Sequence, residues 1–306
     1  MAQPFATFSF IAALRSAILR RMETLADTEI QRLVHMALEE DRGSGDVTSL
    51  STVPSETRAQ AVMVAREAAV ISGLRFAALT FNACDPAAKI ELKSSDAQSV
   101  PARTPLMTIA GLAQAILTAE RVALNFVQRL SGIATLTGKF VDAVKGTKAR
   151  ILDTRKTTPG LRRAEKYAVA CGGGQNHRFG LFDMVLIKDN HLAALRHAAP
   201  NPIAAAVAGA RKRYPKLKVE VESDSLAQVE QALAAGADFI LLDNMSTDQL
   251  RRAVELVKGR AKTEASGGVN LSTVRQIAET GVDFISVGVL THSAPAVDIA
   301  LDFETQ

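Results

Sequence analysis

The second half of the chain repeats one pattern: a short apolar run, a polar turn, and then an amphipathic stretch. The runs cover residues 151–153, 184–187, 219–221, 239–242, 263–265 and 284–287. Two of the units begin alike, with GADFI at 236–240 and GVDFI at 281–285. This alternation is typical of βα units around a parallel sheet. Because no Gly-x-Gly-x-x-Gly turn follows a strand, the pattern favours a closed or nearly closed α/β barrel over an open doubly wound sheet.

The first half has the texture of a small α+β domain. Residues 28–40 form an amphipathic helix, which a capping box of Thr28 and Gln31 is expected to begin. Between residues 58 and 111, β-favouring stretches alternate with Gly, Pro, Asp and Ser, which predicts a small mixed sheet. A long helix over 113–130 follows, with Arg121 on its polar face.

Composition limits the classes of protein that remain. The 306 residues are 47% hydrophobic, enough for two cores, and Cys84 and Cys171 match no metal or disulfide spacing, so we expect a cytoplasmic protein. No apolar run reaches the roughly 20 residues that a bilayer requires. Residues 1–22 are predicted to form an extra N-terminal helix, with an organelle transit peptide as the alternative. A net charge of +4 without any Trp argues against nucleic acid.

Charged residues follow the apolar runs, at the positions where α/β barrels carry their active sites. The first run leads into Thr154, Arg155 and Lys156; Lys188 follows the second. A triple glycine at 172–174 precedes His177 and Arg178. So many cations on one rim repel each other unless anions neutralise them. The sequence therefore predicts a substrate with several carboxylates or phosphates.

Two acids and several glycines complete this rim. Glu222 and Asp243 follow the third and fourth runs, and they either pair with the lysines or help to bind a hydrated Mg²⁺ beside phosphates. The turn Ser266-Gly267-Gly268 and Gly288 follow the last two runs. Barrels commonly bind a phosphate there with main-chain N–H groups.

At this point the sequence closely resembles the quinolinate phosphoribosyltransferase family, from about residue 26 to the C-terminus. The motifs that carry the resemblance, in chain order, are EDRGSGDVT (40–48), ERVALN (120–125), DTRKTTPGLR (153–162), residues 172–191, EVE (220–222), LDN (242–244), EASGG (264–268) and SVG (286–288). The resemblance implies transfer of phosphoribosyl from 5-phosphoribosyl 1-pyrophosphate to quinolinate, with decarboxylation to nicotinate mononucleotide in de novo NAD synthesis.

The fold that the resemblance implies is an N-terminal α+β sandwich domain followed by an incomplete, open α/β barrel resembling a TIM barrel. We expect the first domain to cover residues 1–130, with the tail 290–306 packed back on it, and the barrel to cover 131–289. The resemblance also implies a homodimer with shared active sites, in which Arg121 reaches the site of the neighbouring subunit.

The resemblance further assigns roles to the site residues. It implies that Arg121, Arg155, His177 and Arg178 bind quinolinate, and that Lys156 and Lys188 meet the phosphoribosyl donor. Thr154 belongs to the substrate-binding set, and Ser266, Gly267, Gly268 and Gly288 bind the 5′-phosphate. Lys156, Lys188, Glu222 and Asp243 are the expected catalytic group, with Mg²⁺ held by Glu222 and Asp243 directly, through water, or through substrate.

Three alternatives remain open from the residues alone. A Schiff-base aldolase would use Lys156 or Lys188 as the nucleophile. A protein of the same fold could serve another acceptor, such as nicotinate or the acceptor of the molybdenum-transport-associated branch. A non-catalytic protein would bind an anionic nucleotide, or nucleic acid, without turnover.

Overall fold

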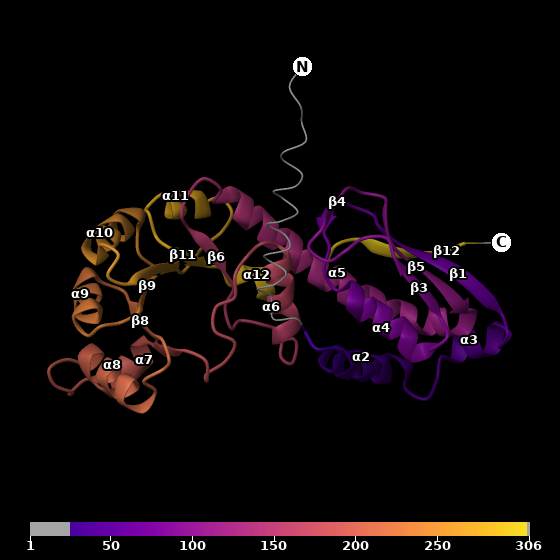
Figure 1. The fold of residues 1–306 in the computed structure, drawn as a ribbon, viewed down its shortest axis with the longest axis horizontal. Helices are drawn as coiled ribbons and strands as arrows, with labels where there is room; N and C mark the ends of the chain where they lie inside the picture. The colour runs from indigo at the N-terminus through magenta and orange to yellow at the C-terminus, as the bar shows by residue number, and fades with distance from the viewer. Residues whose placement is uncertain (1–24, 305–306) are drawn as a thin grey trace, which may run out of the picture. The chain divides into compact units, whose positions relative to one another are not determined.

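A computed structural model describes residues 25–304, and the helix predicted for residues 1–22 lies outside them. The described chain divides into two compact units (Figure 1). Residues up to 138, 163–173 and those from 294 onward form the first unit, and residues 139–162 and 174–293 form the second. The first unit thus includes two segments that the sequence assigned to the barrel domain, residues 131–138 and 163–173, and the second unit includes residues 290–293 of the predicted tail. Within the segment 163–173, Tyr167 donates a hydrogen bond of 2.7 Å from its hydroxyl to Asp96.

The first unit is built on a four-stranded antiparallel sheet in the order β12-β1-β5-β3. These strands are β1 (Arg58–Ala65), β3 (Lys89–Leu92), β5 (Thr104–Leu112) and β12 (Ile299–Glu304), and β2 (Ala69–Val70) pairs separately with β4 (Ser99–Val100). The helices are α2 (Asp27–Arg42), α3 (Val47–Thr52), α4 (Leu74–Cys84), α5 (Ala113–Ala143) and α6 (Arg162–Cys171). Alternate residues of β1, including Ala61 and Met63, are buried in a core that Phe81 and Ile116 share. Figure 1 shows α4 and α5 along one face of the sheet.

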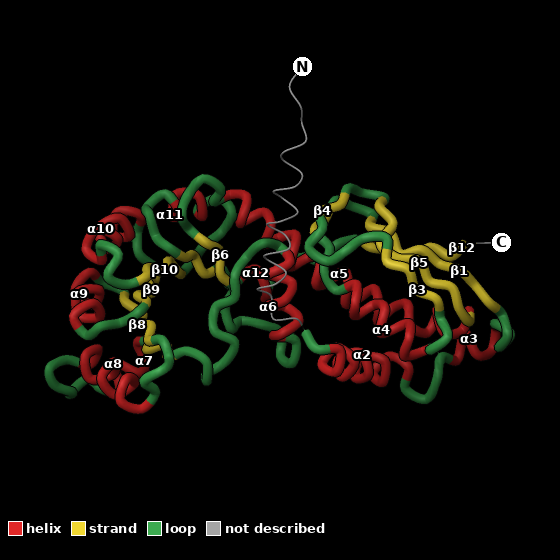
Figure 2. Tube along the Cα trace, in the orientation of Figure 1, coloured by secondary structure: helices red, strands yellow, loops and turns green. Residues whose placement is uncertain are grey.

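The second unit contains six parallel strands in the order β6-β11-β10-β9-β8-β7. They are β6 (Arg150–Leu152), β7 (Val185–Ile187), β8 (Val219–Ser223), β9 (Phe239–Asp243), β10 (Lys262–Ser266) and β11 (Phe284–Ser286). The helices are α7 (Asp189–Ala194), α8 (Pro202–Arg213), α9 (Leu226–Ala234), α10 (Thr247–Val257), α11 (Val274–Ala278) and α12 (Val289–His292). In Figures 1 and 2, α8 to α11 form an outer layer around the strands. In the described chain β6 and β7 do not pair with each other, so the barrel is open.

Two local predictions about helix ends were wrong. Helix α2 begins at Asp27 after Ala26, so Thr28 lies inside the first turn and does not cap the helix. Helix α5 continues to Ala143, well past the predicted end at residue 130. Within the extended part of this helix, Gly132 packs closely on another segment, because a Cβ there would overlap the main-chain oxygen of Pro295. No helix of the described chain is long and apolar enough to cross a bilayer.

Candidate active site

A cavity of about 780 Å³ lies at the carboxyl ends of the strands of the second unit. Its lining consists of Thr154, Arg155, Lys156, His177, Arg178, Leu186, Lys188, Glu222, Leu241, Asp243, Asn244, Glu264, Ser266, Gly267, Gly268, Val269, Ser286, Gly288, Val289 and His292. Every site residue expected from the sequence is in this set except Arg121. The volume falls within the range of small-molecule sites.

Three of these residues lie within strands rather than after them. The sequence placed Glu222, Asp243 and Ser266 just beyond the apolar runs, but β8, β9 and β10 extend to include them. Alternate residues of a strand face opposite sides, so Glu222 points into the cavity while the buried Val221 points away. A strand position fixes such a side chain more firmly than a loop position does.

The loop after β6 is tied to the loop before β7 by Asp153, which is fully buried. Its carboxylate accepts hydrogen bonds from the main-chain N–H of His177 at 2.9 Å and from the side-chain amide of Asn176 at 2.6 Å. Arg162 adds a second tie, donating from its guanidinium to Thr157 and to the main-chain oxygen of Phe179. These bonds hold the segments that carry Arg155 and Arg178 beside each other.

Arg155 and Arg178 give the cavity two cations that are short of acceptors. The Nε atoms of both guanidinium groups are buried, and neither has a hydrogen-bond partner among the residues that the structure describes. Burial, and then the charge of Arg155, lower the pKa of Arg178. Unpaired buried donors are unfavourable. An anion between the two guanidinium groups would relieve both the missing bonds and the repulsion.

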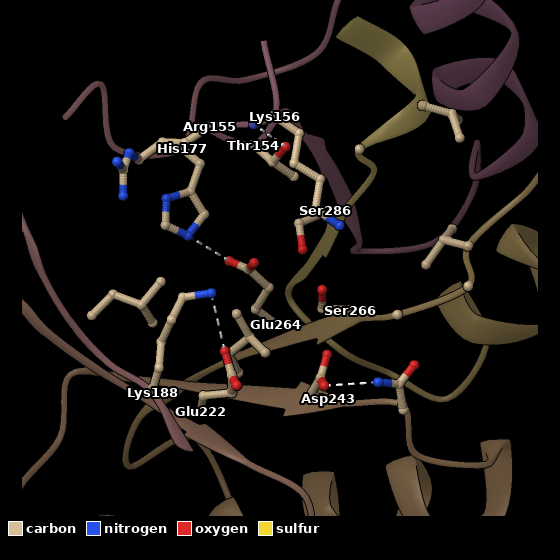
Figure 3. A pocket seen from close by; sticks show the side chains of 18 of the residues that line it. Thr154, Arg155, Lys156, His177, Lys188, Glu222, Asp243, Glu264, Ser266 and Ser286 are labelled. Atoms are coloured by element: carbon tan, nitrogen blue, oxygen red, sulfur yellow. Dashed lines mark hydrogen bonds and ion pairs between the residues drawn. The ribbon is translucent and has the colours of Figure 1, made fainter. Parts of the chain in front are cut away.

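The two lysines of the cavity differ in how they are paired. Lys188 Nζ lies 3.5 Å from Glu222 Oε2, and Figure 3 shows these side chains pointing toward each other. No carboxylate of the described chain lies within ion-pair distance of Lys156 Nζ. The main chain of Lys156 is fixed, because its N–H donates to Thr154 Oγ1 at 3.0 Å and its oxygen accepts from Thr291 at 2.7 Å. Its ammonium is therefore available to a ligand.

The glycine turn after β10 requires glycine. Gly267 has φ +96°, in the region that other residues rarely adopt, and a Cβ on it would overlap the side-chain amide of Asn244. The same Asn244 donates to Asp243 Oδ2 at 2.8 Å. A Cβ on the next residue, Gly268, would meet nothing within 4 Å, so the main chain of the turn borders open space, as that of a phosphate-binding loop does.

Below the cations the barrel interior holds a buried group of one histidine and two acids. The side chains of His177, Glu220 and Glu264 are 8%, 0% and 2% exposed. His177 Nε2 lies 3.0 Å from Glu220 Oε2 and 3.5 Å from Glu264 Oε2. Burial is the main cause that raises the pKa of Glu220 to about 7 and that of Glu264, next to Glu220, to about 8.

The sequence analysis assigned no role to Glu220 or Glu264. The available signal was period-two spacing: Glu220 and Glu222 are two residues apart on one strand, as are Glu264 and Ser266 on another, so each pair faces the same side. The apolar lining residues Leu186 and Leu241 were missed because an inward leucine of a barrel strand looks like any core leucine.

Arg121 lies elsewhere in the chain. It is exposed on α5, in the first unit, and does not line the cavity. The residues on the polar face of this helix differ in their surroundings. Thr118 donates to Asp46 and Gln128 donates to the main-chain oxygen of Ile299, whereas Arg121 and Asn125 are exposed.

Comparison with protein families decides the affiliation. Residues 46–131 match the N-terminal domain of quinolinate phosphoribosyl transferase, and residues 133–302 match its C-terminal domain. The chain belongs to the quinolinate phosphoribosyltransferase family. The fold agrees with this assignment, since it is an antiparallel α+β unit followed by an open α/β barrel.

The similarity to individual relatives extends over most of this chain and most of each relative. The chain is 43% identical over 294 residues to a chloroplastic nicotinate-nucleotide pyrophosphorylase [carboxylating] of Oryza sativa subsp. japonica, covering 91% of this chain and 78% of that protein. It is 44% identical over 275 residues to the Mycobacterium leprae protein of that name, covering 88% and 95%. A solved nicotinate-nucleotide pyrophosphorylase from Francisella tularensis superimposes with a TM-score of 0.87 at 41% identity, covering 92% and 99%.

Proposed function

We propose that the protein transfers the phosphoribosyl group of 5-phosphoribosyl 1-pyrophosphate to quinolinate, releasing pyrophosphate and CO₂ and forming nicotinate mononucleotide for NAD synthesis. The names of its relatives support the reaction. The observation that carries it to this chain is the pair of buried guanidinium Nε atoms of Arg155 and Arg178 without an acceptor. Quinolinate brings two planar carboxylates, which arginine binds with two parallel hydrogen bonds.

The donor would occupy the part of the cavity that lysines and glycines line. Lys156 and Lys188 lie where point charges can meet the pyrophosphate. Ser266, the adjoining glycine turn and Gly288 would bind the 5′-phosphate with hydroxyl and main-chain donors. Supporting this assignment, a Cβ on Gly268 would meet nothing within 4 Å, so this part of the turn borders open space.

Mg²⁺ fits the donor set of the same cavity. Glu222 and Asp243 are carboxylates at the ends of adjacent strands, both partly exposed, and Mg²⁺ is usually bound by one or two carboxylates together with water and substrate phosphates. We propose that these two residues hold it, directly or through water or substrate. When bound, Mg²⁺ would neutralise charge on the pyrophosphate.

The chemistry follows from positioning and charge. As the bond from ribose C1 to pyrophosphate breaks, Lys156 and Lys188 stabilise the leaving anion, and Glu222 or Asp243 faces the cationic ribose. The pyridine nitrogen forms the new bond with its free lone pair, so no base is needed. When the adjacent carboxylate leaves as CO₂, its bonding electron pair stays on the ring carbon, where the pyridinium stabilises it. That carbon then takes a proton from water.

We propose a homodimer in which Arg121 of each subunit completes the partner's site. Its exposure on α5 supports this role. Mixing an Arg121→Ala variant with a Lys156→Ala variant, each nearly inactive, should restore activity, because one site of a hybrid dimer then has both side chains. Mixtures that stay inactive after subunit exchange would exclude a shared site.

The function itself is tested with purified protein, quinolinate, phosphoribosyl pyrophosphate and Mg²⁺, by following nicotinate mononucleotide and CO₂ together. We expect both products, and no nucleotide when nicotinate replaces quinolinate, since its single carboxylate leaves part of the arginine pair unused. Nucleotide without CO₂, or no product from folded protein, would show that the acceptor is wrong.

A cytoplasmic location is part of the proposal, and the free thiols of Cys84 and Cys171 support a reducing compartment. Some plant relatives carry chloroplastic or mitochondrial in their names. Fractionation of cells that make the full chain would decide between cytoplasm and organelle.

A further inference from the structure

The buried group of His177, Glu220 and Glu264, of which His177 and Glu264 line the cavity, contains more polar chemistry than the proposed reaction uses. In the described part of the chain, neither oxygen of Glu220 nor Oε1 of Glu264 meets a donor in full hydrogen-bond geometry, although Nε2 of His177 approaches Glu220 Oε2 to 3.0 Å, within ion-pair distance. Two acids so deeply buried, and so poorly partnered, lower the stability of the fold. A functional use explains why they are present.

The hydrogen bond at the other nitrogen of His177 fixes where the proton of the ring lies. Nδ1 accepts the main-chain N–H of Arg178 at 2.7 Å. An acceptor nitrogen carries no proton, so the proton of the neutral ring is on Nε2. That nitrogen faces Glu220 at 3.0 Å and Glu264 at 3.5 Å. Figure 3 shows the ring directed at Glu264 from above.

We propose that Glu220 and Glu264 are positioning residues for carboxylate recognition: they hold the Nε2 edge of His177, whose Nδ1 in turn holds the main chain of Arg178. This inference rests on the proposed function, because it explains how the guanidinium of Arg178 is kept beside that of Arg155. It also changes the role expected of His177. The ring orients an arginine and lines the cavity, and it supplies no positive charge of its own.

Strand pairing or hydrogen bonds fix the main chain of each residue in this series of contacts. Glu220 is the second residue of β8, paired with Leu186, and Glu264 is the third residue of β10, paired with Leu241, so strand pairing fixes their main chains. Asp153 fixes the main chain of His177 at the end of β6. The guanidinium of Arg178 also donates from Nη1 to the main-chain oxygen of Met184 at 3.1 Å, while its Nε has no hydrogen-bond partner in the described chain.

A metal ion is the competing explanation, because one donor atom from each of His177, Glu220 and Glu264 lies within 4.8 Å of the others. The hydrogen bond from Arg178 argues against it. With Nδ1 already an acceptor, Nε2 carries the proton and has no lone pair to give to a metal.

The first experiment compares two replacements of Glu220 that keep its volume. Glu220→Gln retains an acceptor for Nε2–H, and Glu220→Leu removes it. We expect the glutamine variant to keep KM for quinolinate within about twofold, and the leucine variant to raise it on the order of 10- to 100-fold, with KM for phosphoribosyl pyrophosphate nearly unchanged. Equal losses in both variants would overturn the proposal, because they would show that a charge on Glu220 is required.

A matched control separates positioning from lost stability. Val221 is the buried neighbour of Glu220 on β8, and its side chain faces away from the cavity. Val221→Ala should lower Tm and leave both KM values unchanged. A rise in KM for quinolinate equal to that of the leucine variant would mean that any weakening of β8 has the same effect, and would overturn the specific role of Glu220.

A second measurement needs no turnover. In protein labelled with ¹⁵N-histidine, the His177 signals, assigned by their loss in His177→Gln, should show an unprotonated Nδ1 and a protonated Nε2, and this tautomer should be lost in Glu220→Leu. A protonated Nδ1, or a stoichiometric metal that disappears in Glu220→Gln, would overturn the proposal. If wild-type protein fails to turn over quinolinate, the proposed function falls, while this spectrum still decides the state of His177.

Discussion

The two ends of the barrel strands treat charged side chains in opposite ways. At the amino ends, Asp238 and Asp283, the acids of the repeated GADFI and GVDFI motifs, are fully engaged. Asp238 accepts from the main-chain N–H of Val219 at 2.8 Å and pairs with Arg211 and Lys218. Asp283 accepts from the main-chain N–H of Thr263 at 3.0 Å and pairs with Lys148 and Lys262.

At the carboxyl ends, charged side chains have fewer ion-pair and hydrogen-bond partners within the described chain. Lys156 has no acid within reach in the described chain, Lys188 stands 3.5 Å from Glu222, and two arginines have Nε atoms without acceptors. The pKa directions follow the same division. Burial raises the pKa of Glu264, whereas at Asp283 hydrogen bonds from Thr263 and Lys262 outweigh burial and lower it. Charged side chains at the amino ends link neighbouring strands, and those at the carboxyl ends are available to bind a ligand.

The sharpest test of this division uses one lysine from each end. Lys156→Ala should reduce kcat about 100- to 1000-fold in a folded protein, because the departing pyrophosphate loses a preorganised charge. Lys262→Ala, at the amino end of β10, removes an exposed pair with Asp283 and should leave kcat unchanged. Steady-state kinetics with circular dichroism measures both. Near-normal turnover of Lys156→Ala would remove that residue from the catalytic group.

A pair of aspartates provides the next test. Asp243→Asn should lower kcat on the order of 10- to 100-fold, because a neutral amide no longer faces the cationic ribose or holds Mg²⁺. Its unfolding midpoint in urea should hardly move, since Asp243 is partly exposed and its one recorded hydrogen bond is from Asn244. A large loss of stability with normal kcat would place Asp243 among the structural acids.

The converse is expected at the amino end. Asp283→Asn should lower the free energy of unfolding by about 1.5–3 kcal/mol, the usual worth of hydrogen bonds to a charged group, while kcat stays unchanged. Because the pKa of Asp283 is lowered in the folded state, this stabilisation is complete above about pH 4 and is lost as pH falls through the folded value. Urea titrations at neutral and acid pH measure it. Asp248→Asn, an exposed partner of Arg251, serves as the control.

The last test is a pH slope of opposite sign, at Glu264. A raised pKa means that the folded state holds the proton of Glu264 more tightly, so wild-type stability declines as pH rises from about 4.3 toward about 8. Glu264→Gln cannot ionise and should gain relative stability over that window. Glu279→Gln, a surface partner of Arg275, should show no such trend. Parallel pH profiles for wild type and Glu264→Gln would mean that Glu264 is not strained by burial.

Sequence was a good guide where a pattern has one physical cause. Short apolar runs between amphipathic stretches predicted each barrel strand within a few residues, and the carboxyl-end rule brought Thr154, Lys188 and Asp243 into one cavity. It failed at the start of helix α2, which begins at Asp27 after Ala26 without any side-chain cap. It also gave no role to Glu220 and Glu264, because only the pairing of β8, β9 and β10 places two distant acids beside His177.

The position of strand β12 in the chain has a consequence for folding during synthesis. It pairs with β1 from Ala65↔Ile299 to Gln60↔Glu304, so an edge of the first sheet is made from residues that follow every described barrel strand in the chain. On the ribosome the β1 edge of the first unit stays uncovered until residues 299–304 have emerged, after all the described strands of the barrel. Nascent chains stalled before residue 299 should therefore be the ones that chaperones retain.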